Sequence, residues 1–469
     1  GLGDVYKRQR VSGGDEDSVS AGIDEVWERR LIQAHGGAGT YDFTHGLIRD
    51  VCYAELGPER RRSLHRRVAQ SLAALHAADP DAASATIAEH FDQGGQPAEA
   101  VPHLERAAVV ARHRYAEKEA IGFLERALGL LEQAPPGRDR DRTELRLLAS
   151  LGQALMGTRG YAAPEVGRSL ERARALSDAT ANDPQRFALL SASFLHHAVC
   201  GALELGRTIA TACIDLGAKS GDAAITAGGR WALGSATFHL GEIAFADEQF
   251  AAVAASLGDE PRPRASPYEF GLELGVFSRA YRGHARWLLG DAEAARKFSN
   301  EAMARAEALS HPFSLAVALA YDAMLQQFRG DPELTWRRAD EAAAQCQRHG
   351  FLYYLSWMPI LRGWARARLG SFAEGLAEMR DGYASFLETG ARLRAPYYLA
   401  LMAAVALEGG DVGEALRLVE EGRAAALRAG ERWQDTELTR LDDAARAKRW
   451  SEADASSGRA GRARGPSAC

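Results

Sequence analysis

The chain has 469 residues, more than one hydrophobic core usually spans, so either several domains or an elongated repeat array is expected. Apolar residues make up 46% and aromatic residues 8% of the chain, and strand-like alternation of Val, Ile, Thr and Tyr is scarce, which favours an all-helical protein. The net charge of −6 is small for this length and excludes a global attraction to nucleic acid or to an anionic membrane.

The cysteine usage fits a reducing compartment. The five cysteines are widely spaced and form no CxxC pair or zinc-like grouping with histidine. No apolar stretch reaches the roughly 20 residues that cross a bilayer, and no signal peptide opens the chain. A cytoplasmic protein with no membrane partner is therefore expected.

The first residues differ in sequence character from the rest of the chain. Residues 4–9 read DVYKRQ, which resembles the translation of a transposase end sequence used to tag DNA for sequencing. Lys7 is one of five lysines among 57 basic residues. We expect residues 1–22 to be a non-native, adapter-like start followed by a disordered acidic linker, and the reading frame to be a fragment without its natural N-terminus.

Residues 23–78 predict short helices. A helix is expected to begin near His45, and Gly57-Pro58 restarts the chain, since proline suits a first helical turn. The second helix carries apolar residues at helical spacing and an arginine-rich stretch at 60–67. Those arginines either clamp an acidic surface or phosphate or form a solvated helix face.

Residues 79–441 repeat. Glycine recurs every 40 residues at Gly290, Gly330, Gly370 and Gly410. The positions seven before, five after and twelve after each glycine are small: Gly283, Ala323, Gly363 and Ala403; Ala295, Thr335, Gly375 and Ala415; Ala302, Ala342, Gly382 and Gly422. Small residues let two antiparallel helices approach, and glycine suits the turn between them. These offsets are typical of the tetratricopeptide unit and predict an all-α helical-hairpin solenoid.

The same pattern recurs earlier, with small residues in register at Ala88, Gly95, Ala100 and Ala107 and again around Gly241. Weaker copies surround Gly160 and Gly206. The step from Gly241 to Gly290 is longer, and the excess falls in residues 259–267, which predicts an inserted loop. An alanine-rich bundle without true repeats is the alternative.

No motif for catalysis is present. The sequence lacks a phosphate-binding GxxxxGK[ST] loop, HExxH and GxSxG. We therefore predict a non-enzymatic chain with no catalytic, cofactor-binding or metal-binding residues.

Four arginines form a candidate partner-binding stripe. Arg282 and Arg286 lie one helical turn apart, and Arg362 and Arg366 occupy the equivalent positions 80 residues later. Equivalent positions of a solenoid line one face, so these side chains could bind an acidic peptide. The alternative is that they are solvated or structural, and Asp322 and Gln326 in the intervening unit weaken the stripe.

Several separate blocks resemble one known family. They include FTHGLIRDVCYAEL with GPERRRSLHRRVAQSL, AEHFDQGGQPAEAVPHLERAA, GFLYYLSWMPILRGWARARLG and GERWQDTELTRL. Together they resemble the C-terminal tetratricopeptide region of bacterial multidomain signal-transduction (STAND-type) ATPases, across roughly residues 41–441.

The resemblance implies a regulatory, partner-binding sensor array whose ATPase core, with its ATP and Mg²⁺ site, lies upstream. It implies that residues 23–78 are the tail of the ATPase module and a winged-helix-like junction, with His45, Arg49, Arg61, Arg62 and His65 at the interdomain contact. Partners would be another protein or the parent's own ATPase domain, without direct nucleic-acid binding. The alternative is the C-terminal part of a class III adenylate/guanylate cyclase or of an ATP-dependent transcriptional activator.

The family pattern continues into another helical pair, but this chain departs from it at about Asp442. Residues 442–469 are polar and arginine-rich. We expect them to be a disordered basic tail, either natural or produced by a frameshift.

Overall fold

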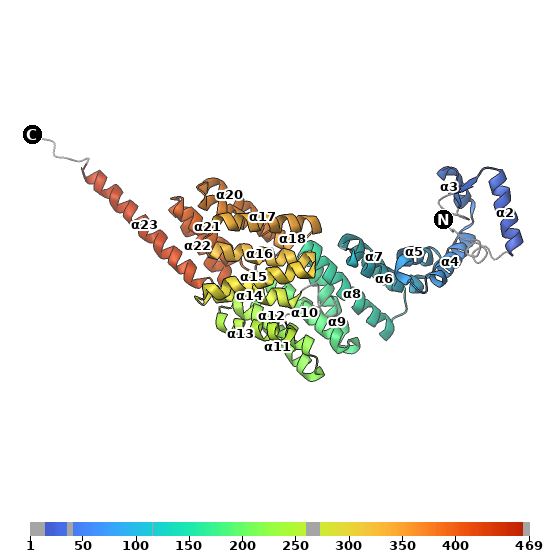
Figure 1. Ribbon diagram of the computed structural model, residues 1–469, viewed down its shortest axis with the longest axis horizontal. Coiled ribbons are helices and arrows are strands. Elements are labelled where there is room, and N and C mark those ends of the chain that lie inside the picture. Colours follow the sequence, from blue (N-terminus) through green and yellow to red (C-terminus); the bar gives the residue numbers. More distant parts are fainter. Residues whose placement is uncertain (1–14, 35–40, 115, 259–272, 463–469) are drawn as a thin grey trace, which may run out of the picture. The chain divides into compact units, whose positions relative to one another are not determined.

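The computed structural model describes residues 15–34, 41–114, 116–258 and 273–462, and most of them are helical. The chain divides into two compact units, residues 1–154 and 155–469, with the boundary inside helix α8 (Figure 1). The first unit holds α2 (Glu16–Glu28), β1 (Ile32–Ala34), β2 (Tyr41–Phe43), α3 (Gly46–Glu55), α4 (Pro58–Leu75), the 3₁₀ turn η1 (Pro80–Ala83), α5 (Ser84–Gln93), α6 (Pro97–His113), α7 (Glu117–Leu131) and most of α8 (Arg138–Arg159).

The second unit is a run of helices of similar length. It holds α9 (Pro164–Thr180), α10 (Asp183–Val199), α11 (Leu203–Ser220), α12 (Ala223–His239), α13 (Ile243–Leu257), α14 (Leu274–Leu288), α15 (Ala292–Leu309), α16 (Pro312–Phe328), α17 (Pro332–His349), α18 (Leu352–Leu355), α19 (Met358–Arg368), α20 (Phe372–Glu388), α21 (Ala395–Glu408), α22 (Val412–Ala429) and α23 (Asp435–Arg462). Successive helices pair as hairpins, and α14 to α17 lie stacked against one another (Figure 1). The predicted all-α, tetratricopeptide-like solenoid is confirmed.

The turns inside the hairpins follow from a two-residue signal. Gly290, Gly330 and Gly410 have φ of 87°, 73° and 92°, in the left-handed region that only glycine adopts freely. In each case the next residue is aspartate, whose side chain caps the second helix; Asp331 Oδ1, for example, accepts a 3.0 Å hydrogen bond from the backbone N–H of Leu334. Gly-Asp therefore closes one helix and starts the next.

The small residues of the repeat register lie where paired helices touch. Ala323, Thr335 and Ala342 of α16 and α17 are completely buried. A Cβ added at Gly363 in α19 would lie 2.6 Å from the carbonyl oxygen of Gly375 in α20. The predicted register is confirmed, because these positions have no room for a larger side chain.

One weak copy of the repeat has a different register. The turn between α10 and α11 is made by Gly201, with φ of 88°. Gly206 lies inside α11, at the small position five residues later, where an added Cβ would lie 3.4 Å from the ring of Phe194. The predicted inserted loop at 259–267 lies outside the described residues.

In the first unit, β1 and β2 form a short antiparallel hairpin between α2 and α3. Helix α2 begins at Glu16, so part of the linker expected up to residue 22 is helical; Asp15 caps it by accepting a hydrogen bond from the Ser18 N–H at 2.8 Å. Helix α4 packs on α5 and α6 through a core of Ala69, Ile87, Phe91 and Ala100. The predicted boundary between 78 and 79 is therefore crossed by continuous packing, and the units divide at residues 154 and 155 instead.

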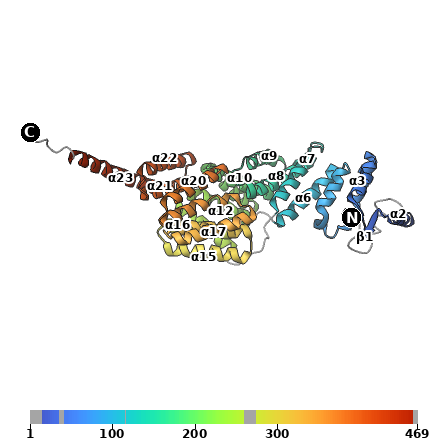
Figure 2. The same ribbon diagram turned by 90° about the horizontal axis from the view of Figure 1, so that it is seen from above.

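The C-terminal prediction was wrong in part. Helix α23 continues through Asp442 to Arg462, and its first half packs on α21 and α22 with Leu438, Leu441 and Ala445 buried. Its second half extends away from those helices (Figure 2). The alanines among the polar residues favour helix, a preference that the low apolar content of the segment obscured. Within the described part of the chain, no helix is long and apolar enough to cross a membrane.

Candidate functional site

The second unit closes on itself through two loops, residues 389–394 between α20 and α21 and residues 430–434 between α22 and α23, here called the closure loops. The backbone N–H groups of Arg392 and Leu393 donate to the carbonyl oxygen of Val199 at 2.8 and 3.1 Å. The N–H of Arg432 donates to the carbonyl oxygen of His239 at 2.8 Å. The late closure loops thus dock on the ends of α10 and α12, so the array forms a closed turn.

Glycines at the early turns permit this contact. A Cβ at Gly241 would lie 3.2 Å from Cβ of Arg432, and one at Gly201 would lie 3.3 Å from Cβ of both Arg392 and Ala429. Both glycines also have positive φ, at 89° and 88°. They therefore serve both the hairpin turn and the close approach of the closure loops.

Glu431 and Trp433 of the second closure loop insert into the interior. The Glu431 carboxylate, fully buried, accepts hydrogen bonds from His239 Nδ1 and from the backbone N–H of Arg394, both at 3.0 Å, and from Nε1 of Trp433. His239 and Glu431 are separated by 192 residues in the sequence. Burial lowers the pKa of His239 despite the neighbouring carboxylate, and since a carboxylate only accepts, Nδ1 carries a proton.

Arg394 of the first closure loop is also buried in the interior, and its backbone conformation is unusual. It is 2% exposed, and its φ of 70° places it in the left-handed region as the N-cap of α21. Its Nη2 donates to the hydroxyl groups of Tyr281 and Tyr321 at 3.1 and 2.7 Å, and its Cζ lies 4.5 Å from the ring centroid of Trp357. Among the described residues no carboxylate forms an ion pair with this guanidinium, while the backbone N–H of the same residue donates to Glu431 at 3.0 Å.

His239, Tyr281, Tyr321, Arg394, Glu431 and Trp433 are here called the interior cluster. Two further polar groups lie beside it. Nε1 of Trp357 and the hydroxyl group of Tyr398 are buried and make no hydrogen bond within the described part of the chain. Unmade hydrogen bonds, a left-handed arginine and a buried charge each cost free energy. The closed interior is therefore held by specific contacts and also carries local strain.

The four predicted stripe arginines lie elsewhere. Arg282 and Arg286 pair with Asp247 of α13 at 3.0 and 2.6 Å, and Arg362 and Arg366 pair with Glu378 of α20 at 2.5 and 2.9 Å. They face neighbouring second helices of the hairpins and do not contact the interior cluster. At the intervening unit the charges are exchanged, since Asp322 pairs with Arg338 of α17 at 2.8 Å. Partner binding by these arginines stays a prediction.

The predicted junction residues come together only in part. His65 Nε2 lies 2.8 Å from the hydroxyl group of Tyr53, and Arg61 stacks 4.5 Å from the centroid of the same ring. His65 also lies with its Nδ1 2.7 Å from Nδ1 of His90, which links α3, α4 and α5. His45, Arg49 and Arg62 do not join this group: His45 makes no side-chain cap at the start of α3, and the two arginines form exposed ion pairs with Asp50 and Glu59.

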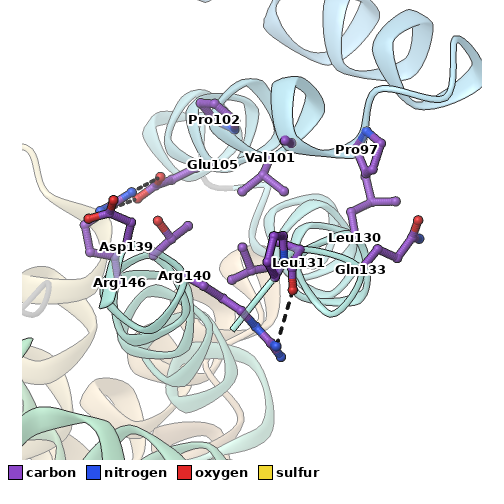
Figure 3. Close-up of a pocket in the computed structure, with 14 residues that line it drawn as sticks. Pro97, Val101, Pro102, Glu105, Leu130, Leu131, Gln133, Asp139, Arg140 and Arg146 are labelled. Atoms are coloured by element: carbon purple, nitrogen blue, oxygen red, sulfur yellow. Dashed lines mark hydrogen bonds and ion pairs between the residues drawn. The ribbon is translucent and has the colours of Figure 1, made fainter. Parts of the chain in front are cut away.

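The first unit also contains a pocket of about 440 Å³ between α6, α7 and the start of α8 (Figure 3). Its walls are mainly apolar, with Val101, Pro102 and Leu131 among them, and the ion pair of Glu105 with Arg146 at 3.0 Å lies at one side. The sequence contained no motif that indicated it. Among the described residues, no group of three or more His, Cys, Asp and Glu side chains is placed to hold a metal ion.

The interior cluster was missed by the sequence interpretation, although a signal existed. Tyr281 and Tyr321 are 40 residues apart and so occupy equivalent positions, as do the loop glycines Gly390 and Gly430. The 40-residue step of the turn glycines within the hairpins is thus repeated by the glycines of the loops between them. The cluster also depends on contacts across 192 residues, which a local pattern does not reveal.

Comparison with known proteins gives one similar sequence and several similar structures. No family model matches the chain. An uncharacterized protein of Rhizobium meliloti (strain 1021) is 26% identical over 426 residues, which are 89% of this chain and 41% of that protein. The chain thus spans less than half the length of the curated relative that it matches.

The similar structures are helical proteins with low sequence identity. A Rap protein in complex with competence and sporulation factor is 10% identical, with a TM-score of 0.49 over 74% of this chain and 99% of that one. A STAND protein with a tetratricopeptide repeat sensor from Pyrococcus horikoshii is 11% identical, with a TM-score of 0.35 over 94% of this chain and 62% of that one.

Proposed function

We propose that this chain is the regulatory sensor array of a bacterial, cytoplasmic signal-transduction ATPase. In this proposal the array binds a protein or peptide partner and passes that event to an ATPase module, with its ATP and Mg²⁺, elsewhere in a longer parent protein. The chain itself performs no catalysis. The resemblance of several sequence blocks to the STAND-type family and the greater length of the Rhizobium meliloti relative support a parent of this kind.

The closure of the second unit is the observation that carries the proposal. The closure loops join helices far apart in the sequence through a few hydrogen bonds and one buried cluster. A change in curvature of the array must break these contacts together, because they bridge its early and late hairpins. We infer that the array can adopt an open as well as this closed arrangement, and a partner that binds one of them better would shift the equilibrium toward it.

The experiment uses the Rhizobium meliloti relative. ATP turnover is measured for the full-length relative and for a variant that lacks the 426 residues matched by this chain. The proposal predicts that deletion changes turnover several-fold, since a regulatory array either restrains or activates its ATPase. Equal turnover of the two proteins, or no ATPase activity in the full-length relative, would contradict it. Calorimetry with the present chain alone is expected to detect no ATP binding.

A further inference from the structure

We propose that the interior site filled by Glu431 and Trp433 is a receptor for a partner segment with an acidic residue two positions before a tryptophan, and that the closure loop is its resident competitor. This inference rests on the proposed partner-binding function and names the chemistry of the partner. The site lies in the second unit, between α12, α16 and α21.

The contacts of the loop are those of a bound peptide. Trp433 packs among rings from three helices, with centroid distances of 5.4 Å to Phe238, 6.2 Å to Phe328 and 5.3 Å to Tyr397. The Glu431 carboxylate is held by a histidine and a backbone N–H. The N–H of the residue between them donates to the carbonyl oxygen of His239. One aromatic pocket, one carboxylate site and one main-chain hydrogen bond define a short recognition motif.

The charged and donor groups of the site determine which charge its occupant should carry. The buried guanidinium of Arg394 has tyrosine hydroxyl groups and the Trp357 ring as its neighbours, and if Glu431 leaves, the backbone N–H of Arg394 also loses its acceptor. A buried, uncompensated charge is strongly unfavourable, so the vacated site favours a carboxylate over a neutral or basic group. His239, which donates from Nδ1 to the carboxylate at 3.0 Å, also selects an acceptor at this position.

The geometry also explains why a partner can compete. Residues 430–434 lie between two helices, and Glu431, Trp433 and Gln434 are buried while Arg432 remains exposed. A partner segment can replace these side chains without unfolding α22 or α23. Because the same loop closes the array, such replacement would open it.

The test uses full-length protein and synthetic peptides. In the double variant Glu431→Ala with Trp433→Ala the site is vacated, and Arg432→Ala, which changes an exposed residue of the same loop, is the matched control. The probe is a capped peptide of residues 428–436, with two controls: the same peptide with glutamate replaced by glutamine, and the equivalent loop of residues 388–396, which has neither feature in that register. Binding is measured by calorimetry, and circular dichroism checks folding.

The double variant is expected to bind the 428–436 peptide at least about 10-fold more tightly than the wild-type and Arg432→Ala chains, where the tethered loop competes. Replacing glutamate by glutamine should weaken that binding by about 10-fold, as expected for hydrogen bonds to a charged group. Absence of binding, or equal binding of all three peptides, would overturn the inference. Where the double variant does not fold, Glu431→Gln replaces it, and the same tighter binding relative to wild type is required. ATP turnover does not enter this test, so its failure leaves the proposed ATPase regulation to be judged separately.

Discussion

Alanine at Gly363 should destabilise the second unit even though alanine is the better helix former. The added Cβ would lie 2.6 Å from the carbonyl oxygen of Gly375 and 2.9 Å from the backbone nitrogen of Met379. Both are backbone atoms of α20, so no side chain can rotate away and the two helices must separate. Overpacking of this kind costs about 3 kcal/mol, and the helix propensity of alanine offsets about 1 kcal/mol. A net loss of about 2 kcal/mol in the free energy of unfolding follows.

Gly413→Ala is the matched control in the same unit. Its Cβ would come no closer than 3.7 Å to Oδ1 of Asp411, so only the propensity gain of at most about 1 kcal/mol remains. Urea unfolding followed by circular dichroism separates the two: the midpoint should fall by about 1 M for Gly363→Ala, with a slope of about 2 kcal/mol/M, and should stay or rise for Gly413→Ala. Because repeat arrays can unfold in steps, the slopes are compared as well. A Gly363→Ala protein as stable as wild type would refute the close-packing argument.

Three further predictions concern His284, two cysteines and a pair of arginines. Burial lowers the pKa of His284 to about 3. As the pH falls below about 6.5, the unfolded chain therefore binds a proton at this residue that the folded chain does not bind, and the free energy of unfolding falls. His284→Gln should remove about 2.5 kcal/mol of the loss between pH 6.5 and 4.5, measured by urea unfolding at both pH values; equal losses would contradict it. Burial raises the pKa of the Cys346 thiol to about 12, whereas Cys52 is exposed, so a thiol reagent should label Cys52 quickly and Cys346 only in denaturant. Replacing Arg362 and Arg366 together by alanine should cost only about 1 kcal/mol, since both are part-exposed; a collapse of the thermal transition would show that these ion pairs are essential to the fold.

Local physical chemistry made the hairpins readable from the sequence. Glycine followed by aspartate at the turns, and small residues at fixed distances from them, specify where a helix ends, where the next begins and where the two touch. These are short-range requirements, so the order of residues expresses them directly. The same reasoning failed at α23, where low apolar content obscured a helix whose first half packs on its neighbours.

The interior cluster is decided only by the tertiary structure. Arg394 and Glu431 resemble ordinary charged residues of loops in the sequence, yet both are buried, and Glu431 meets His239 across 192 residues. The small rotation from each hairpin to the next accumulates along the array, and that sum determines whether the closure loops reach Val199 and His239. The pairing of Arg282 with Asp247 and of Arg362 with Asp340 likewise depends on how neighbouring hairpins pack. The sequence therefore determined the unit and its register, whereas the three-dimensional stacking of the units determined which residues form the site.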